Sequence, residues 1–343
     1  MNAAVVSQEG TPVASNVAFV SNWKLPALAA SEVLVKTEAS ALNHLDLWVG
    51  KGMPGLALEY PRVSGSDGCG IVIEVGEGVD NDWIGKRVLL NAAVRQPEKV
   101  RPGYSPSPED IRMIGEHDNG ANAEQFIAPV ENVLDIGDAD PIEAAAFALS
   151  HLTAWRMLVT RAQLRAGQTV LITGIGGGAA LASFNIAKHF GCTTIVTSRH
   201  QWKLDRALEL GASETVLDEG DDWSRTIRGL TGKRGVDVCV DSVGGQLHLP
   251  CIKSLARGGT LVTCGCTAGA SPKTDLARVF WNQLSVLGST MGDMDEFREV
   301  VSLFVNNGMR AVIDSVHDAS NAQDAFARLE SGEQFGKVVL RWV

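Results

Sequence analysis

The stretch Thr169-Val170-Leu171-Ile172-Thr173-Gly174-Ile175-Gly176-Gly177-Gly178-Ala179-Ala180 decides how the second half of this chain folds. An apolar run typical of a strand leads directly into glycines, and the apolar segment 181–190 that follows is typical of a helix. In this order, the glycines let the backbone approach a pyrophosphate, and the helix N-terminus attracts its charge. We therefore predict nucleotide binding by Gly174, Gly176, Gly177, Gly178 and Ala179, against the alternative of a tight turn without a ligand.

The segments after this turn alternate between two patterns. Short apolar runs at 194–197, 236–240 and 260–263 alternate with helical stretches such as 203–210 and 223–230. Strands that are apolar on both faces, with helices between them, are typical of a doubly wound parallel sheet. The sequence therefore predicts an α/β nucleotide-binding domain over residues 151–290.

The first 130 residues have a different pattern. Short alternating runs at 32–36, 70–75 and 87–90 are broken by turn residues, which predicts a β-rich domain such as a small barrel. The C-terminal tail combines helical segments at 296–305 and 322–329 with a strand at 337–340. Periodicity alone assigns this tail to neither domain.

Composition excludes several classes of function. Lys and Arg number 30 against 40 for Asp and Glu, and the net charge of −10 comes without any basic run, so nucleic acid is not an expected partner. No apolar window is long enough to span a bilayer, and the N-terminus lacks the features of a signal peptide. We expect a cytoplasmic protein without a membrane partner.

In dinucleotide-binding domains, the residue at the end of the next strand contacts the ribose of the dinucleotide. An acidic residue there favours NAD, whereas this chain has Ser198 and Arg199, with Lys203 one turn later. A hydroxyl and a guanidinium can bind a 2′-phosphate, so the pattern favours NADP(H) over NAD. The alternative is that Arg199 and Lys203 are solvated charges at the start of a helix.

Several local motifs occur together along the chain. They are Glu32-Val33-Leu34-Val35-Lys36, Asn43-His44-Leu45-Asp46, Gly65-Ser66-Asp67-Gly68-Cys69-Gly70, Thr153-Ala154-Trp155, Asp241-Ser242-Val243-Gly244-Gly245 and Gly258-Gly259-Thr260-Leu261-Val262. Together with the glycine turn and the final strand Gly336-Lys337-Val338-Val339-Leu340, these motifs make the chain resemble the medium-chain dehydrogenase/reductase superfamily over nearly its whole length. The resemblance implies a GroES-like β-barrel catalytic domain over 1–150 and 291–343, a Rossmann domain over 151–290, and an active site in the cleft between them.

Zinc divides this superfamily into branches. Where zinc-dependent relatives have their ligands, this chain has Asn43, Ser66 and Ser150, and an amide and two hydroxyls are poor zinc ligands. The proline-rich segment 96–108, interpreted as an excursion loop, lacks the four cysteines of a structural zinc site. We therefore expect no metal, although a makeshift site from Asp67 and His44 is an open alternative.

The remaining pattern resembles the zinc-free quinone oxidoreductase and enoyl reductase branch. The resemblance implies hydride transfer from NADPH to a quinone or an α,β-unsaturated carbonyl. Asn43 is the first candidate for holding a carbonyl or the nicotinamide, followed by His44 and Asp46. For His44 and Asp46 the alternative is local capping and loop bonding.

The family pattern also implies further contacts. Ser150 and Thr153 are expected at the nicotinamide, and Val243 and Gly265 at the cofactor. The apolar segment 284–289 is expected to be the edge strand of a homodimer. Two other functions stay open: an alcohol or aldehyde dehydrogenase with atypical or no zinc, and a non-catalytic NADPH-binding protein.

Overall fold

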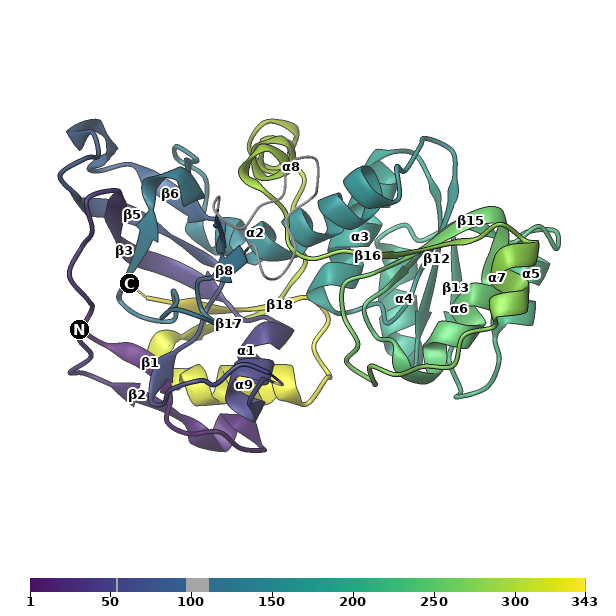
Figure 1. The fold of residues 1–343 in the computed structure, drawn as a ribbon, viewed down its shortest axis with the longest axis horizontal. Helices are drawn as coiled ribbons and strands as arrows, with labels where there is room; N and C mark the ends of the chain where they lie inside the picture. The colour runs from purple at the N-terminus through teal and green to yellow at the C-terminus, as the bar shows by residue number, and fades with distance from the viewer. Residues whose placement is uncertain (54, 97–110, 343) are drawn as a thin grey trace. The chain divides into compact units, whose positions relative to one another are not determined.

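The computed structural model describes residues 1–53, 55–96 and 111–342, and the chain divides into two compact units. The first contains residues 1–149 and 292–343, and the second contains residues 150–291. The predicted excursion loop falls almost entirely on residues outside this description. Figure 1 shows the strands and helices of both units.

Among its described residues, the first unit has two larger sheets and a two-stranded sheet. The larger sheet has the strand order β10 (Val133–Asp135), β6 (Arg87–Leu90), β5 (Gly68–Val75), β3 (Glu32–Ala41), β18 (Lys337–Arg341) and β17 (Ile313–Asp318), with β9 (Gln125–Pro129) also paired to β3. The three-stranded sheet contains β2 (Val17–Val20), β1 (Ala3–Val6) and β4 (Arg62–Val63), and the two-stranded sheet contains β7 (Ala93–Arg95) and β8 (Ile111–Met113). The alternating pattern along β3, with Val33 and Val35 fully buried, confirms the predicted β-rich domain.

The C-terminal tail belongs to this first unit. β18 lies antiparallel to β3, with Val339 opposite Ala41, and parallel to β17. Beyond the ladder, the Leu42 N–H donates to the Val338 carbonyl (2.9 Å). The register therefore places the start of β18 beside the residues that follow β3.

Helices flank the sheets of the first unit (Figure 1). They are α1 (His44–Lys51), α8 (Met294–Asn307) and α9 (Ala322–Glu330), while α2 (Pro141–Trp155) continues from the first unit into the second. The buried side of α9, including Phe326, shares a core with Leu42 and Leu340. α1 ends at Gly52, whose φ of 82° is a conformation that glycine adopts without strain.

The second unit is a six-stranded parallel sheet with helices between its strands (Figure 1). The strand order is β13 (Glu214–Leu217), β12 (Thr193–Ser198), β11 (Thr169–Ile172), β14 (Val236–Asp241), β15 (Leu255–Thr263) and β16 (Ser285–Gly288). The connecting helices are α3 (Gly178–His189), α4 (Gln201–Glu209), α5 (Ser224–Leu230), α6 (His248–Ser254) and α7 (Leu276–Trp281). This order confirms the predicted doubly wound sheet and places β11 at the point where the direction of winding reverses.

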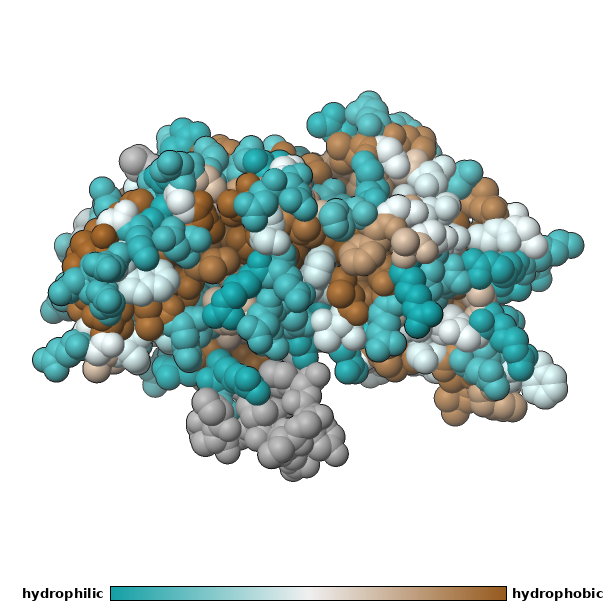
Figure 2. Space-filling model, turned by 90° about the horizontal axis from the view of Figure 1, so that it is seen from above, coloured by the Kyte–Doolittle hydropathy of each residue, from teal (hydrophilic) through white to brown (hydrophobic). Residues whose placement is uncertain are grey.

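The surface is mixed in character. Hydrophilic residues cover much of the face in Figure 2, with hydrophobic patches between them. Among the described residues, no helix combines the length and the apolar composition needed to cross a bilayer.

Candidate functional site

A buried polar cluster lies where β3 ends in the first unit. The Asn43 Nδ2 donates to Asp67 Oδ2 (2.8 Å), and the Lys337 ammonium donates to Asn43 Oδ1 (2.6 Å) and to Asp67 Oδ2 (2.8 Å). The other oxygen of Asp67 accepts the Leu149 N–H (2.7 Å). Asp67 is fully buried and Lys337 is 3% exposed, so the cluster balances its charges within the protein.

Asp46 supports the start of α1. Its Oδ2 accepts the Asn43 N–H (2.7 Å), and its Oδ1 accepts from Asn122 Nδ2 (3.2 Å), which also contacts the Ser64 hydroxyl. Burial raises the pKa of Asp46, and the hydrogen bonds from Asn43 and Ser64 oppose this shift. Both carboxylate oxygens are engaged within the protein, in agreement with the capping alternative.

His44 is the first residue of α1 and has an exposed side chain. Its ring meets Trp48 edge-on, with 5.9 Å between ring centroids. Desolvation by the surrounding protein lowers the pKa of His44, and the nearby charge of Lys51 lowers it further. The lowered pKa favours the neutral imidazole.

The positions that correspond to zinc ligands have other partners in the first unit. The Ser66 hydroxyl is buried and donates to the Ile114 carbonyl (2.8 Å), and the Asn43 oxygen accepts from Lys337. Among the residues that the structure describes, no three His, Cys, Asp or Glu side chains come together as a metal site. The makeshift combination of Asp67 and His44 has no third acidic, thiol or imidazole ligand within that part of the chain.

Three residues that contact Asn43, Asp67 or Asp46 were not predicted from the sequence, namely Lys337, Asn122 and Ser64. Lys337 lies in an apolar strand run, where a lysine was a usable signal of a buried ion pair. Asn122 and Ser64 belong to no recognisable motif, although Asn122 also accepts from the Ser40 hydroxyl (2.8 Å). The cluster depends on strand pairing between distant segments, which local patterns do not reveal.

The glycine turn, residues 174–178, lies in the second unit between β11 and α3. Gly174 and Gly176 have φ values of 63° and 117°, which favour glycine. At the start of α3, the Leu181 N–H donates a hydrogen bond to the Gly177 carbonyl (3.0 Å). The N–H groups of Gly178, Ala179 and Ala180 come before this bond along the chain. No described side chain caps this helix, and its first N–H groups can therefore receive an anion.

Loops from three parallel strands meet around this turn. Asp241 ends β14, accepts from the Thr173 hydroxyl (2.7 Å), and also accepts the Val243 N–H (3.0 Å). A Cβ at Gly174 would lie 2.9 Å from the Val243 side chain, and a Cβ at Gly265 would lie 3.1 Å from the Ser242 carbonyl. The predicted cofactor residues Gly174 and Val243 are thus in contact, and Gly265 packs against the same loop.

The residues predicted to contact the ribose lie at the end of β12 and shortly after it. Ser198 is buried, and its hydroxyl accepts the His200 N–H (3.1 Å). Arg199 is exposed, and no described residue forms an ion pair with it. Lys203 is only 6% exposed, with its ammonium 5.3 Å from the Trp202 ring centroid, so the alternative of a solvated charge is wrong for Lys203.

Helix α2 carries Ser150 and Thr153, both buried in the second unit. The Ser150 hydroxyl lies 3.4 Å from Nδ1 of His151. The Thr153 hydroxyl has no hydrogen-bond partner among the described residues. Because an unpaired buried hydroxyl is costly, this atom fits a site that a polar ligand group completes.

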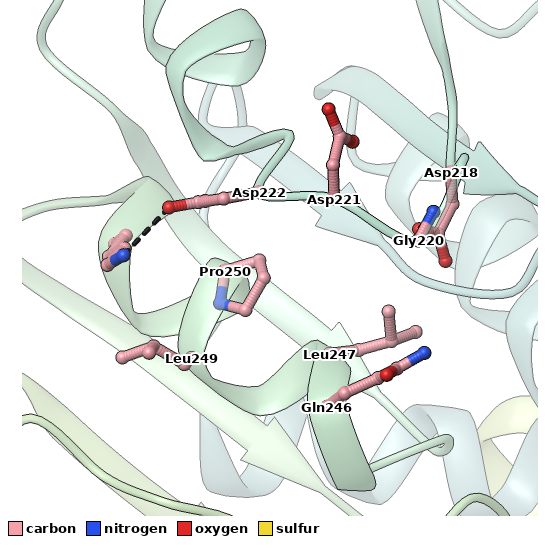
Figure 3. A pocket seen from close by; sticks show the side chains of 9 residues that line it. Asp218, Gly220, Asp221, Asp222, Gln246, Leu247, Leu249 and Pro250 are labelled. Atoms are coloured by element: carbon pink, nitrogen blue, oxygen red, sulfur yellow. Dashed lines mark hydrogen bonds and ion pairs between the residues drawn. The ribbon is translucent and has the colours of Figure 1, made fainter.

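A cavity of about 220 Å³ is lined by residues that follow β13 and by residues at the start of α6 (Figure 3). Its lining includes Asp218, Asp221 and Asp222, and an ion pair joins Asp222 to Lys253 (2.7 Å). The Asp218 N–H donates to the Ser198 carbonyl (2.8 Å), which connects this acidic lining to β12. The negative charge of this acidic lining disfavours a phosphate, whereas the uncapped start of α3 favours one.

Comparison with known families gives two matches in this chain. The model of the alcohol dehydrogenase GroES-like domain matches residues 29–138. The model of the zinc-binding dehydrogenase matches residues 178–306. The first match confirms the expected GroES-like domain.

Individual relatives cover nearly the whole chain. A zinc-type alcohol dehydrogenase-like protein, YogA, of Leptosphaeria maculans is 32% identical over 336 residues, which cover 92% of each chain. A quinone oxidoreductase of Rattus norvegicus is 25% identical over 329 residues, covering 93% of this chain and 92% of the relative. A solved structure of an NAD-dependent alcohol dehydrogenase has a TM-score of 0.90, 34% identity, and 99% coverage of both chains.

Proposed function

The chain belongs to the medium-chain dehydrogenase/reductase superfamily, and from this premise we propose that it is an NADP(H)-dependent reductase of quinones or α,β-unsaturated carbonyls that works without zinc. The superfamily consists of oxidoreductases that bind a nicotinamide cofactor. The choice of NADP(H), the acceptor class and the independence of zinc are the new parts of this proposal.

The polar cluster at Asn43 carries the proposal. An amide oxygen is a weak zinc ligand, and here it already accepts from the Lys337 ammonium at 2.6 Å. The same ammonium lies 2.8 Å from Asp67 Oδ2, the nearest carboxylate oxygen in the cluster. A Zn²⁺ ion at these two oxygens would meet a buried positive charge of like sign. This arrangement favours chemistry that depends on hydrogen bonding rather than on a bound metal.

The residues of the second unit fit a nicotinamide dinucleotide. The uncapped start of α3 suits a pyrophosphate, exposed Arg199 suits a 2′-phosphate, and the unpaired Thr153 hydroxyl suits the nicotinamide carboxamide. When bound, the cofactor supplies the hydride. The protein's own residues bind and orient it, which is the larger part of their contribution to such a reaction.

At the acceptor, we assign to Asn43 the hydrogen bond to the carbonyl or quinone oxygen. The lowered pKa of His44 disfavours a cationic imidazole as the acid. Of the two tyrosines, the Tyr60 hydroxyl donates to the Val49 carbonyl (2.5 Å), and Tyr104 lies outside the described residues. We therefore propose that the proton of the reduced product comes from water.

Alcohol oxidation is the second candidate, because two of the relatives above have names of alcohol dehydrogenases. One assay separates the candidates: NADPH oxidation with a panel of quinones and enones, next to NADP⁺ reduction with primary and secondary alcohols, before and after treatment with a chelator. We expect quinone or enone reduction that the chelator does not change. Chelator-sensitive alcohol oxidation would contradict the proposal, and so would NADPH binding without turnover, which indicates a non-catalytic protein.

We also propose that the chain forms a homodimer through the edge of the second unit. β16 pairs only with β15 among the described strands. On the neighbouring α7, Leu276, Phe280 and Trp281 are each 70–71% exposed, an unusual display for large apolar side chains. Light scattering at high micromolar concentration is expected to give the mass of a dimer, and a persistent monomer would contradict this interface.

A further inference from the structure

Lys337 is a buried cation whose position depends on the tail of the chain. The pairing of β18 with β3 brings its ammonium to Asn43, which lies 294 residues away in sequence. With 3% of its surface exposed, it has lost nearly all contact with water. A buried ammonium is tolerated only when strong acceptors surround it, and Asn43 Oδ1 and Asp67 Oδ2 provide them.

The three side chains form a closed triangle that fixes both ends of the Asn43 amide. Lys337 donates to its oxygen, and its nitrogen donates to Asp67 (2.8 Å). If the amide were reversed, its NH₂ group would face the ammonium and its oxygen would face the carboxylate, so both contacts would become repulsive. The orientation of the amide is therefore set by two opposite charges.

The amide nitrogen has a second hydrogen that is held weakly. Its other contact is the Ala41 carbonyl at 3.4 Å, near the limit of a hydrogen bond. Asn43 is half-buried, whereas Asp67, Lys337 and Asp46 are all at least 97% buried, so Asn43 is the member of this group that a ligand can reach. The positive charge at its oxygen also polarises the amide, which strengthens its N–H groups as donors.

We propose that Lys337 and Asp67 act as a clamp that holds the Asn43 amide with its nitrogen ready to donate to the acceptor oxygen. Lys337 is then a positioning residue, because it acts through Asn43. This inference rests on the function proposed above and extends it to the residues that orient the acceptor.

A double-mutant cycle in the full chain tests the clamp. Lys337→Met alone leaves the Asp67 carboxylate without its cation, so the working variant is Lys337→Met with Asp67→Asn, which removes both charges together. We expect its kcat with a quinone to fall about tenfold to a hundredfold, with NADPH affinity changed by less than about threefold. Lys86→Met, which removes an exposed lysine of the same unit, is the matched control and is expected to leave kcat unchanged.

The cycle is completed in an Asn43→Ala background. If the clamp acts through Asn43, adding the two clamp substitutions there causes little further loss of kcat. Losses that multiply would overturn the proposal, as would a normal kcat in a folded Lys337→Met/Asp67→Asn variant.

A second readout does not depend on turnover. In NMR spectra of the wild type, the Asn43 side-chain hydrogen that is donated to Asp67 is expected to exchange slowly with solvent, and this protection is expected to be lost in the Lys337→Met/Asp67→Asn variant. If the wild type reduces no quinone or enone, the proposed function fails while this measurement still tests the clamp. Fast exchange in the wild type would overturn the clamp even where turnover is normal.

Discussion

The two units differ in whether their buried polar groups have hydrogen-bond partners within the protein. In the first unit, Asn43, Asp67 and Lys337 satisfy one another inside the protein. In the second unit, the start of α3 has no side-chain cap, and the Thr153 hydroxyl has no partner among the described residues. Folding satisfies the polar groups of the first site, whereas polar groups of the second site stay available to a ligand. Substitutions in the first are therefore expected to change stability or catalysis, and those in the second to change affinity.

The largest effect is expected from breaking the buried ion pair. Lys337→Met leaves the Asp67 carboxylate buried without its cation, and the free energy of unfolding is expected to fall by about 3–5 kcal/mol. Chemical denaturation followed by tryptophan fluorescence measures this loss. The control Lys86→Met, at an exposed ion pair, is expected to change stability by less than about 0.5 kcal/mol. Equal small effects of both variants would contradict the contrast between the units.

The converse change places a charge at the open helix start. Gly177 has φ −77° and ψ 153°, which any residue can adopt, and a Cβ there meets no atom closer than 4.0 Å. Gly177→Asp is expected to weaken NADPH binding by on the order of a hundredfold, through repulsion of the pyrophosphate, while stability changes by only a few tenths of a kcal/mol. Gly177→Asn, of the same shape without charge, is the control in a titration by fluorescence. Comparable losses in both variants would show that charge at this helix start is not decisive.

Arg199 tests the choice of cofactor within the second unit. A guanidinium on a phosphate contributes about 1.5–3 kcal/mol, so Arg199→Ala is expected to raise the Kd of NADPH roughly tenfold to a hundredfold. The Kd of NADH is expected to stay nearly unchanged. Arg206→Ala, on the exposed part of α4, serves as control. Equal losses for the two cofactors would indicate that Arg199 does not read the 2′-phosphate.

His44 gives the smallest expected effect. Because the pKa of His44 is lowered from its usual value near 6.5, the ring is deprotonated throughout the range above neutrality. The rate is therefore expected to change little between about pH 7 and pH 9, and His44→Ala is expected to cost less than about threefold in kcat. A steep loss above neutral pH that disappears in His44→Ala would restore the imidazole as general acid.

Local sequence patterns predicted the second unit well. The glycine turn follows its strand immediately, so its order and its backbone requirements are visible within about a dozen residues. Helix ends were less certain: Trp223 was placed in a helix but precedes α5, where its buried side chain anchors the loop in the core. The residues that surround the turn follow β14 and β15 in the chain, and only the sheet order brings Val243 to Gly174.

The first unit was less accessible from sequence. Asn43 was recognised as a candidate, yet its partners depend on the register of β18 against β3, which no local pattern defines. Asp46 was considered for catalysis because of its neighbours in the motif, whereas its oxygens are used by Asn43 and Asn122. Long-range pairing, rather than residue type, determined which polar atoms remain free.

The central claim is that Lys337, and not a metal, supplies the positive charge at Asn43 and Asp67. The most direct measurement is the zinc content of the protein purified from zinc-supplemented cells, together with its turnover of NADPH and a quinone before and after chelation. We expect well under one zinc per chain and turnover that chelation leaves unchanged. One tightly held zinc per chain, with turnover lost on its removal, would contradict the claim.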